Sequence, residues 1–266
     1  MSFGWQVVVV VDAGSDQEAV DLALDRFWFH GADAVEERPD RLIAGFARRE
    51  DAEVAASETG GELVEVTDDS WLDTWRAYAR EVRIADRLVV RPAWLEPSTD
   101  IDTPTIAIDP GHSFGSGDHP STRLVLHELA ALVHGGETVF DVGCGSGVLA
   151  IAAVRLGGSH AVAIDIEPQA LDVTVANAAA NHVDGQIDVS ASWPGPNARF
   201  DLVLANIGAR VLREMAPALV AATGRTLILS GLMVGQADPI LDAFGELKVV
   251  GRPVDGEWEA VVLERP

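Results

Sequence analysis

Along the second half of the chain, short apolar runs alternate with longer amphipathic stretches. The runs predict buried strands, and apolar residues at helical spacing predict the helices between them. We expect strands near residues 105–109, 138–141, 161–164, 186–189, 200–205, 226–229, 248–253 and 258–264, and helices near 123–134, 148–156, 168–181, 211–222 and 236–244. This alternation predicts a mostly parallel α/β sheet that ends in an antiparallel hairpin.

The first part of the chain follows a different order. Residues 1–67 show the order β-α-β-β-α-β, which is typical of a small ferredoxin-like α+β domain. Its first run, Trp5 to Asp12, is so apolar that we expect a central strand covered on both faces. Residues 68–104 form a connector, with Trp71, Trp75 and Tyr78 on one face of a helix and a short hairpin after it. The expected division is therefore 1–67, 68–104 and 105–266.

A glycine-rich turn follows the strand that begins at Thr138. Gly143, Gly145 and Gly147 occupy alternate positions directly after this strand, and an apolar helix begins at Val148. Glycine is needed where the backbone takes positive φ or where a ligand lies against the main chain. The turn ends at a helix N-terminus, where free N–H groups face outward. We therefore expect the turn to hold a polar ligand rather than merely to connect two elements.

Two acidic residues indicate which ligand this is. A dinucleotide-binding loop would carry a third glycine where this chain has Val148. Asp141, just before the glycines, suits a ligand with an amino group, and Asp165, at the end of the next strand, is placed to bind two ribose hydroxyls. A ligand with a ribose, a cationic amino acid part and no phosphate is S-adenosylmethionine. An NAD-dependent oxidoreductase is disfavoured.

Two further segments lie where they could complete this site. The glycine-rich stretch Asp109 to Thr122 could close over a ligand, with Phe114 stacking on a flat ring and Thr122 supplying a hydroxyl at a helix start. Asn206 follows the strand 200–205, and ligands of parallel sheets bind at the carboxyl ends of the strands. Its side-chain oxygen could accept hydrogens of an amine and aim the nitrogen lone pair.

Composition and charge limit the kinds of molecule that this protein is expected to bind. The net charge is −23 with a single lysine, Lys248, so the protein should repel nucleic acid and attract a basic protein. No apolar run is long enough to span a bilayer. Cys144 is the only cysteine and the first residues lack a basic signal region, so we expect a cytoplasmic protein. His112 and His119 have no third ligand at metal spacing, so no metal site is expected.

The chain resembles the ribosomal protein L11 methyltransferase (PrmA) family. The resemblance covers nearly the whole chain and is carried by W-L-D-T-W, F-G-S-G-D-H-P-S-T, F-D-V-G-C-G-S-G, A-I-D-I-E-P and L-A-N-I. It implies a Rossmann-like, seven-stranded class I methyltransferase domain behind a ferredoxin-like substrate-recognition domain. It also implies that Thr122, Gly143, Asp165 and Asn206 bind S-adenosylmethionine.

The resulting hypothesis is a protein N-methyltransferase that modifies lysine or N-terminal amines of a large-subunit ribosomal protein. The site is expected to comprise Asn206 as the catalytic residue and Thr122, Gly143, Gly145, Asp165, Asn206 and Phe114 as cofactor-binding residues. The expected protein is a monomer without metal, membrane or direct nucleic-acid contacts. The alternatives are a methyltransferase for another protein or a small-molecule amine, and a non-catalytic module that kept the cofactor fold.

Overall fold

The computed structural model of this chain describes residues 5–11, 17–32, 34–38, 40–46, 48–65, 80–96, 103–111 and 113–266. The chain divides into two compact units, residues 1–78 and 79–266. The predicted aromatic face of Trp71, Trp75 and Tyr78 lies outside the described residues. Where the chain is described, its helices are too short or too polar to cross a bilayer.

The smaller unit is a four-stranded antiparallel sheet with two helices. Its elements are β1 (Trp5–Val10), α1 (Gln17–Phe29), β2 (Ala34–Arg38), β3 (Arg41–Phe46), α2 (Arg49–Thr59) and β4 (Glu62–Glu65). The strand order is β2-β3-β1-β4, so β1 is central, as the order β-α-β-β-α-β predicts.

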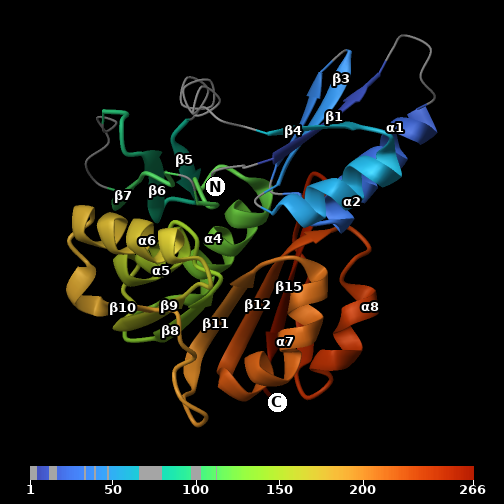
Figure 1. The fold of residues 1–266 in the computed structure, drawn as a ribbon. Coiled ribbons are helices and arrows are strands. Elements are labelled where there is room, and N and C mark those ends of the chain that lie inside the picture. Colours follow the sequence, from blue (N-terminus) through green and yellow to red (C-terminus); the bar gives the residue numbers. More distant parts are fainter. Residues whose placement is uncertain are drawn as a thin grey trace. The chain divides into compact units, whose positions relative to one another are not determined.

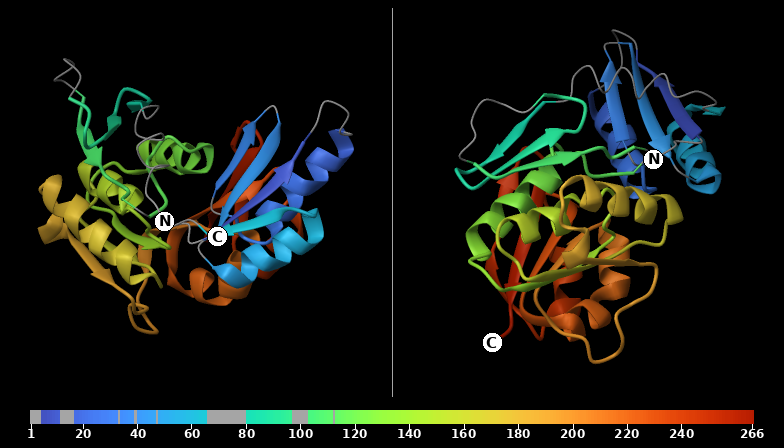
Figure 2. Two further views of the ribbon diagram at one scale, coloured as in Figure 1. Left: turned by 45° about the horizontal axis from the view of Figure 1, so that its top comes forward. Right: turned by 90° about the vertical axis from the view of Figure 1, so that its left-hand side faces the viewer.

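Within this unit, β1 is covered on one face only, so the expectation of a doubly covered strand is wrong. Val7 is fully buried in a core with Phe27 of α1 and Ala52 of α2, whereas Val10 is 78% exposed. Both helices lie on the same face of the sheet (Figure 2), because each follows a strand through a crossover of the same hand. The valine run reflects the preference of β-branched residues for a pleated backbone, and this preference does not require burial on both faces.

The larger unit contains the predicted parallel sheet. Its elements from residue 120 on are α4 (Pro120–Leu132), β8 (Thr138–Val142), α5 (Val148–Arg155), β9 (His160–Ile164), α6 (Pro168–Ala180), β10 (Ile187–Ser190), β11 (Phe200–Asn206), α7 (Ala209–Ala222), β12 (Thr223–Met233), α8 (Asp238–Leu241), β13 (Lys248–Gly251), β14 (Val254–Asp255) and β15 (Trp258–Glu264). The order is β10-β9-β8-β11-β12-β15-β13, with β14 paired to β15. The strands from β10 to β12 run parallel, and β15 runs antiparallel to both its neighbours. This confirms the predicted fold class.

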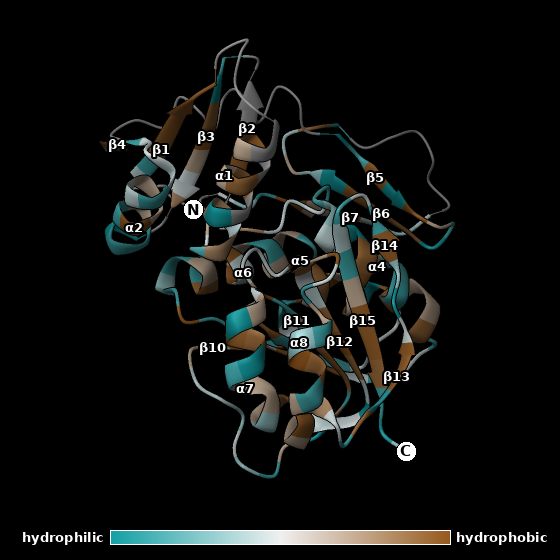
Figure 3. Cartoon of the chain, turned by 90° about the vertical axis from the view of Figure 1, so that its right-hand side faces the viewer, coloured by the Kyte–Doolittle hydropathy of each residue, from teal (hydrophilic) through white to brown (hydrophobic). Residues whose placement is uncertain are grey.

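Helices cover both faces of this sheet and create two separate cores (Figure 1). Successive side chains on a strand point to opposite faces. Val139 and Leu204 therefore pack in the core under α4 and α5, while Phe140 and Val203 pack in the core under α7. Figure 3 shows the strands β11, β12 and β15 in apolar colours, with polar residues on α7 beside apolar ones. The continuous apolar runs of the sequence thus belong to strands that are buried on both sides.

A small three-stranded sheet adjoins this core: β5 (Val82–Ile84), β6 (Leu88–Pro92) and β7 (Thr105–Ile108), in the order β5-β6-β7. Side chains of α6 satisfy the free edge of β7. Asn181 accepts from Ala107 N–H and donates to Ala107 C=O, both at 2.8 Å. Asn177 forms the same pair with Asp109, at 3.0 and 2.9 Å. The two pairs match because four residues of helix and two of strand each advance about 6 to 7 Å.

We expect Asn181→Ala to destabilise the larger unit by about 2–3 kcal/mol, since the substitution leaves both backbone groups of Ala107 without a partner. Urea unfolding followed by tryptophan fluorescence would measure this loss. Asn197→Ala, in an exposed loop, is the matched control and should change stability by less than about 0.5 kcal/mol. Equal stability of the two variants would contradict the bracing role of Asn181.

Candidate functional site

The predicted site residues meet at the carboxyl edge of three adjacent parallel strands, β9, β8 and β11. In the sheet register Val142 lies opposite both Ile164 and Ala205, so the residues that follow these strands emerge side by side. These residues are Gly143 after β8, Asp165 after β9 and Asn206 at the end of β11. The N–H groups of Gly143 and Cys144 both donate to Ile164 C=O, at 2.9 and 3.0 Å. The structure thus brings these three predicted residues together.

The glycine turn takes the backbone shape that only glycine adopts easily. Gly143, Gly145 and Gly147 have φ of +76°, +53° and +78°. A Cβ at Gly145 would lie 2.5 Å from Phe114 C=O, and one at Gly147 would lie 2.7 Å from Thr174. A Cβ at Gly143 would lie 2.5 Å from the Ile207 side chain. Close packing inside the protein therefore requires these glycines, in addition to any role in approaching a ligand.

Asp165 is held in place by the turn itself. Its Oδ2 accepts from Gly145 N–H at 2.9 Å, and its Oδ1 accepts from Glu167 N–H at 3.0 Å. An ionised carboxylate has about four acceptor positions, so two backbone donors leave capacity for further donors. The side chain is half-buried. The carboxylate is thus fixed at the sheet edge and can still accept from hydroxyl groups, as the ribose prediction requires.

The segment before α4 lies directly on the glycine turn. Ser146 N–H donates to Phe114 C=O at 2.9 Å, and Ser146 Oγ donates to Gly115 C=O at 2.5 Å. Phe114 is half-buried, with its ring in edge contact with His119 at 5.2 Å between centroids. Phe114 is therefore at the predicted site, although the ring contact that the structure shows is with a protein side chain.

The helix α4 begins at Pro120, earlier than the residue 123 that the sequence indicated. His119 is its N-cap: Nδ1 accepts from Ser121 N–H at 3.3 Å and contacts Ser121 Oγ at 2.8 Å. Pro120 at the first helical position was the missed signal. Thr122 consequently lies inside the first turn, 1% exposed, and accepts a hydrogen bond from Asn206 Nδ2 at 3.2 Å. The two predicted residues are thus direct partners.

His119 makes the stability of this region depend on pH. Burial lowers the pKa of its imidazole to about 4, and the ring contacts Trp258 at 4.7 Å as well as Phe114. Below pH 6.5 the unfolded chain binds a proton there that the folded chain does not bind, so stability falls as the pH decreases from about 6.5 to 4.

We expect His119→Asn, which keeps a capping acceptor but does not titrate, to remove this dependence. At pH 4 the wild type should have lost roughly 2–3 kcal/mol more than this variant, relative to their stabilities at pH 7. Urea unfolding at several pH values measures the difference. Both proteins have the same carboxylates, so the effect of carboxylate titration on stability is the same in both and drops out of the comparison. If the free energy of unfolding changed with pH in the same way in both proteins, His119 would not be a buried, neutral N-cap.

Two buried oxygens at the site have no hydrogen-bond partner within the described residues, Asp141 Oδ1 and Asn206 Oδ1. Asp141 is fully buried, and its other oxygen accepts from Ala150 N–H at 3.2 Å. Burial, with the charge of Asp165 as a smaller cause, raises the pKa of the Asp141 carboxyl to about 7. Buried acceptors are normally satisfied, so these two atoms are candidates to accept from donors of a ligand.

Three features of the site were not found from the sequence. Ile166, next to Asp165, is 88% exposed, which places an apolar side chain at the rim of the site. Asn177 donates to both Asp109 C=O and Ser146 C=O at 2.9 Å and so ties two loops together. Arg123 bonds Asp255 Oδ2 through its Nε at 2.8 Å and also donates to Asp118 C=O. Of these three features, only that of Asn177 had a signal in the sequence, because Asn177 and Asn181 are four residues apart and so lie on one side of a helix.

Other reactive groups near the site give no separate chemistry. Burial raises the pKa of the Cys144 thiol well above its usual range, so the sulfur is not a poised nucleophile. His112 lies outside the described residues. Among the residues that are described, no three His, Cys, Asp or Glu side chains are grouped as a metal ion would require.

Comparison with known proteins identifies close similarity over most of the chain. Residues 17–266 match the family model "Ribosomal protein L11 methyltransferase (PrmA)". The ribosomal protein L11 methyltransferase of Salmonella newport is 37% identical over 84% of this chain and 73% of its own length. That of Chloroflexus aurantiacus is 35% identical over 76% of this chain and 70% of its own. The crystal structure of a ribosomal protein L11 methylase from Lactobacillus delbrueckii superposes with a TM-score of 0.64 at 28% identity, over 71% of this chain and 98% of that one.

Proposed function

The chain belongs to the ribosomal protein L11 methyltransferase family, and on that basis we propose that it methylates amino groups of ribosomal protein L11 at the site around Asn206. The protein is an S-adenosylmethionine-dependent protein methyltransferase. Family membership removes the NAD-dependent oxidoreductase from consideration. The observation that carries the proposed site is the buried Oδ1 of Asn206, which has no partner among the described residues and lies at the same sheet edge as the glycine turn and Asp165.

The residues present fit S-adenosylmethionine, which supplies an electrophilic methyl group on a sulfonium when bound. Asp165 would accept from the ribose hydroxyls, because two of its acceptor positions remain free. Asp141, whose Oδ1 has no partner in the part of the chain that the structure describes, would accept from the amino group. Gly143 and Gly145 would let the ligand lie against the turn, with Phe114 and Thr122 beside it.

The acceptor amine must reach the site without its proton. A free lysine has a pKa of about 10.4, so only roughly one in a few thousand is neutral at pH 7. The net charge of −23 attracts a basic protein but also favours the protonated amine. Burial in the site must therefore lower the lysine pKa. Asn206 Oδ1 then accepts a remaining amine hydrogen and directs the lone pair, an alignment worth several kcal/mol of the barrier.

The decisive experiment is incubation of the purified full chain and S-adenosylmethionine labelled in its methyl group with purified ribosomal protein L11. Mass spectrometry should find methylated lysine or N-terminal amines on L11. A parallel incubation uses a cell extract in place of purified L11. If L11 stays unmodified and the label enters a different protein or a small-molecule amine of the extract, the proposed substrate is contradicted and one of the alternatives is supported.

The remaining partners are part of the proposal. A polyanion is disfavoured by the net charge, so we propose no direct nucleic-acid contact. A ribosomal substrate and a lone buried cysteine both fit a cytoplasmic protein, and we propose that it is a monomer. Gel filtration with light scattering would test the monomer.

A further inference from the structure

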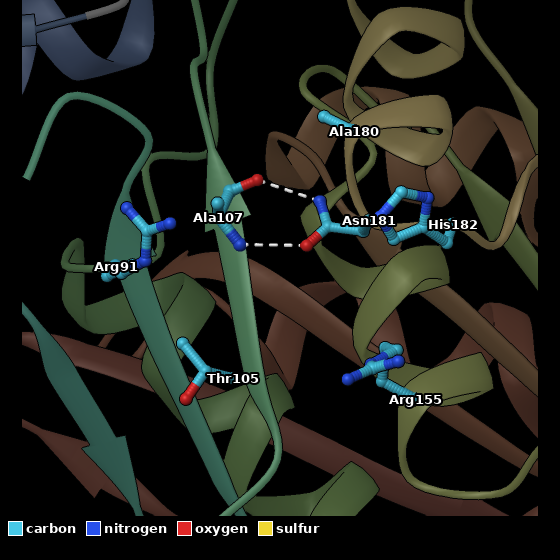
Figure 4. A pocket seen from close by; sticks show the side chains of 7 residues that line it. All are labelled: Arg91, Thr105, Ala107, Arg155, Ala180, Asn181 and His182. Carbon is cyan, nitrogen blue, oxygen red and sulfur yellow. Dashed lines mark hydrogen bonds between the residues drawn. The ribbon is translucent and has the colours of Figure 1, made fainter. Parts of the chain in front are cut away.

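A hollow in the larger unit lies away from the sheet edge that carries the proposed methyltransferase site. Its volume is about 200 Å³, and Figure 4 shows the side chains around it. The lining residues are Arg91, Thr105, Ala107, Arg155, Ala180, Asn181 and His182. They come from β6, β7 and the C-terminal ends of α5 and α6. Asp165 precedes the other end of α6, a helix of 13 residues and so about 20 Å long.

The floor of this hollow is the outer face of the small sheet. In the register of β6 and β7, Arg91 lies opposite Ala107, and Val89 opposite Thr105. Arg91, Thr105 and Ala107 therefore share one face, while Ile106 and Ile108 are buried on the other. Two of the lining side chains, Ala107 and Ala180, are methyl groups, which leave room above this floor.

The charge of the lining is opposite to that of the protein. The chain has 42 acidic and 19 basic residues, yet the described residues that line the hollow include two arginines, a histidine and no carboxylate. Arg155 and His182 form no side-chain hydrogen bond or ion pair with any residue that the structure describes. Arg91 donates through Nη1 to Pro92 and Ala93 C=O at 3.1 and 3.3 Å and to Leu95 C=O, and its other nitrogens have no acceptor among the described residues.

The nearby helix ends leave few free carbonyls for these side chains to bind. A helix C-terminus attracts cations through its unpaired carbonyls. Here backbone donors occupy those carbonyls: Ala178 and Ala179 C=O accept from Val183 and His182 N–H at 3.0 Å, and Ala153 C=O accepts from Gly158 N–H at 2.9 Å. The neutral polar groups are also engaged, since Asn181 bonds Ala107 and Thr105 Oγ1 donates to Thr103 C=O at 3.2 Å. The charged groups among the described lining residues are therefore the two arginines, whose N–H groups can donate.

We propose that this hollow binds a small phosphate-class oxyanion, either inorganic phosphate or the terminal phosphate of a monoester. Arginine guanidinium groups match the geometry of phosphate oxygens, and these oxygens accept from the N–H groups that the arginines offer. The volume fits one such group rather than a folded partner. The net charge of −23 disfavours a polyanion at the same place. This proposal does not depend on the proposed methyl transfer.

The test is calorimetric titration of the full chain with inorganic phosphate in chloride buffer of constant ionic strength. We expect one saturable site. Arg155→Gln should weaken it at least tenfold, and Ala180→Glu, which places a carboxylate at the exposed rim, should abolish it. Arg213→Gln, an exposed arginine on α7, is the matched control and should leave it unchanged.

Parallel titrations identify the source of the phosphate. Binding of adenosine monophosphate that also depends on Arg155 supports a monoester site. Binding only of an oligonucleotide without terminal phosphates would overturn the proposal in favour of a nucleic-acid contact. The proposal also fails if the wild type shows no saturable uptake of phosphate, or if Arg155→Gln and Ala180→Glu bind it as the wild type does.

Discussion

Asn206→Ala is expected to lower kcat for methyl transfer by roughly 100-fold while changing the Kd for S-adenosylmethionine by less than about threefold. The substitution removes the buried Oδ1 that has no partner within the described residues, and with it the group proposed to aim the acceptor amine. It also removes the donor to Thr122, an interaction at 3.2 Å that orients the Asn206 side chain. Steady-state kinetics with saturating cofactor, paired with calorimetry, separates the two effects.

The control for this variant is Asn197→Ala, which changes the same residue type in an exposed loop. Its kcat should match that of the wild type. If Asn206→Ala lost cofactor affinity and turnover by equal factors, Asn206 would hold the cofactor rather than aim the amine. Circular dichroism of the variant is needed to show that β11 and α4 keep their structure.

Asp165→Asn is expected to have the opposite profile. The Kd for S-adenosylmethionine should rise about 10- to 100-fold, because hydrogen bonds to a carboxylate are worth about 1.5–3 kcal/mol and those to a neutral amide less. One amide oxygen also cannot serve both Gly145 N–H and Glu167 N–H as the carboxylate does, so the turn loses part of its support. Turnover at saturating cofactor should fall only a few-fold.

Glu167→Gln is the matched control for this experiment. It removes an exposed negative charge two residues from Asp165 and keeps the backbone N–H that donates to Asp165 Oδ1. A similar loss of cofactor affinity in Glu167→Gln would mean that general attraction between the acidic surface and the cationic cofactor is responsible. An unchanged Kd in Asp165→Asn would remove Asp165 from the proposed ribose site.

The position of the site at the carboxyl ends of the strands could be predicted from the sequence, because it depends on the order of strands and helices along the chain. In a parallel sheet, the residues that follow neighbouring strands must emerge together, so Gly143, Asp165 and Asn206 could be placed without coordinates. The positive φ values of the glycines likewise follow from their residue type.

Contacts between distant segments could not be predicted in this way. Asn181 meets Ala107 and Asn206 meets Thr122 across 74 and 84 residues, and no local pattern specifies such pairs. The histidine N-cap of α4 was missed because serine, threonine, aspartate and asparagine are the usual caps. The single-sided cover of β1 depends on which face both helices occupy, and the valine run contains no information about this.

The hydrogen bonds from Asn177 and Asn181 to the edge of β7, here called the asparagine clip, affect how copies of this protein behave at high concentration. An exposed strand offers a row of unused backbone donors and acceptors, and a second chain can add a strand there and start aggregation. At Ala107 and Asp109, α6 occupies those groups with its own side chains. Such a clip protects against this association without a charge or a proline in the strand, so Asn181→Ala should also shorten the time for which a concentrated solution stays clear.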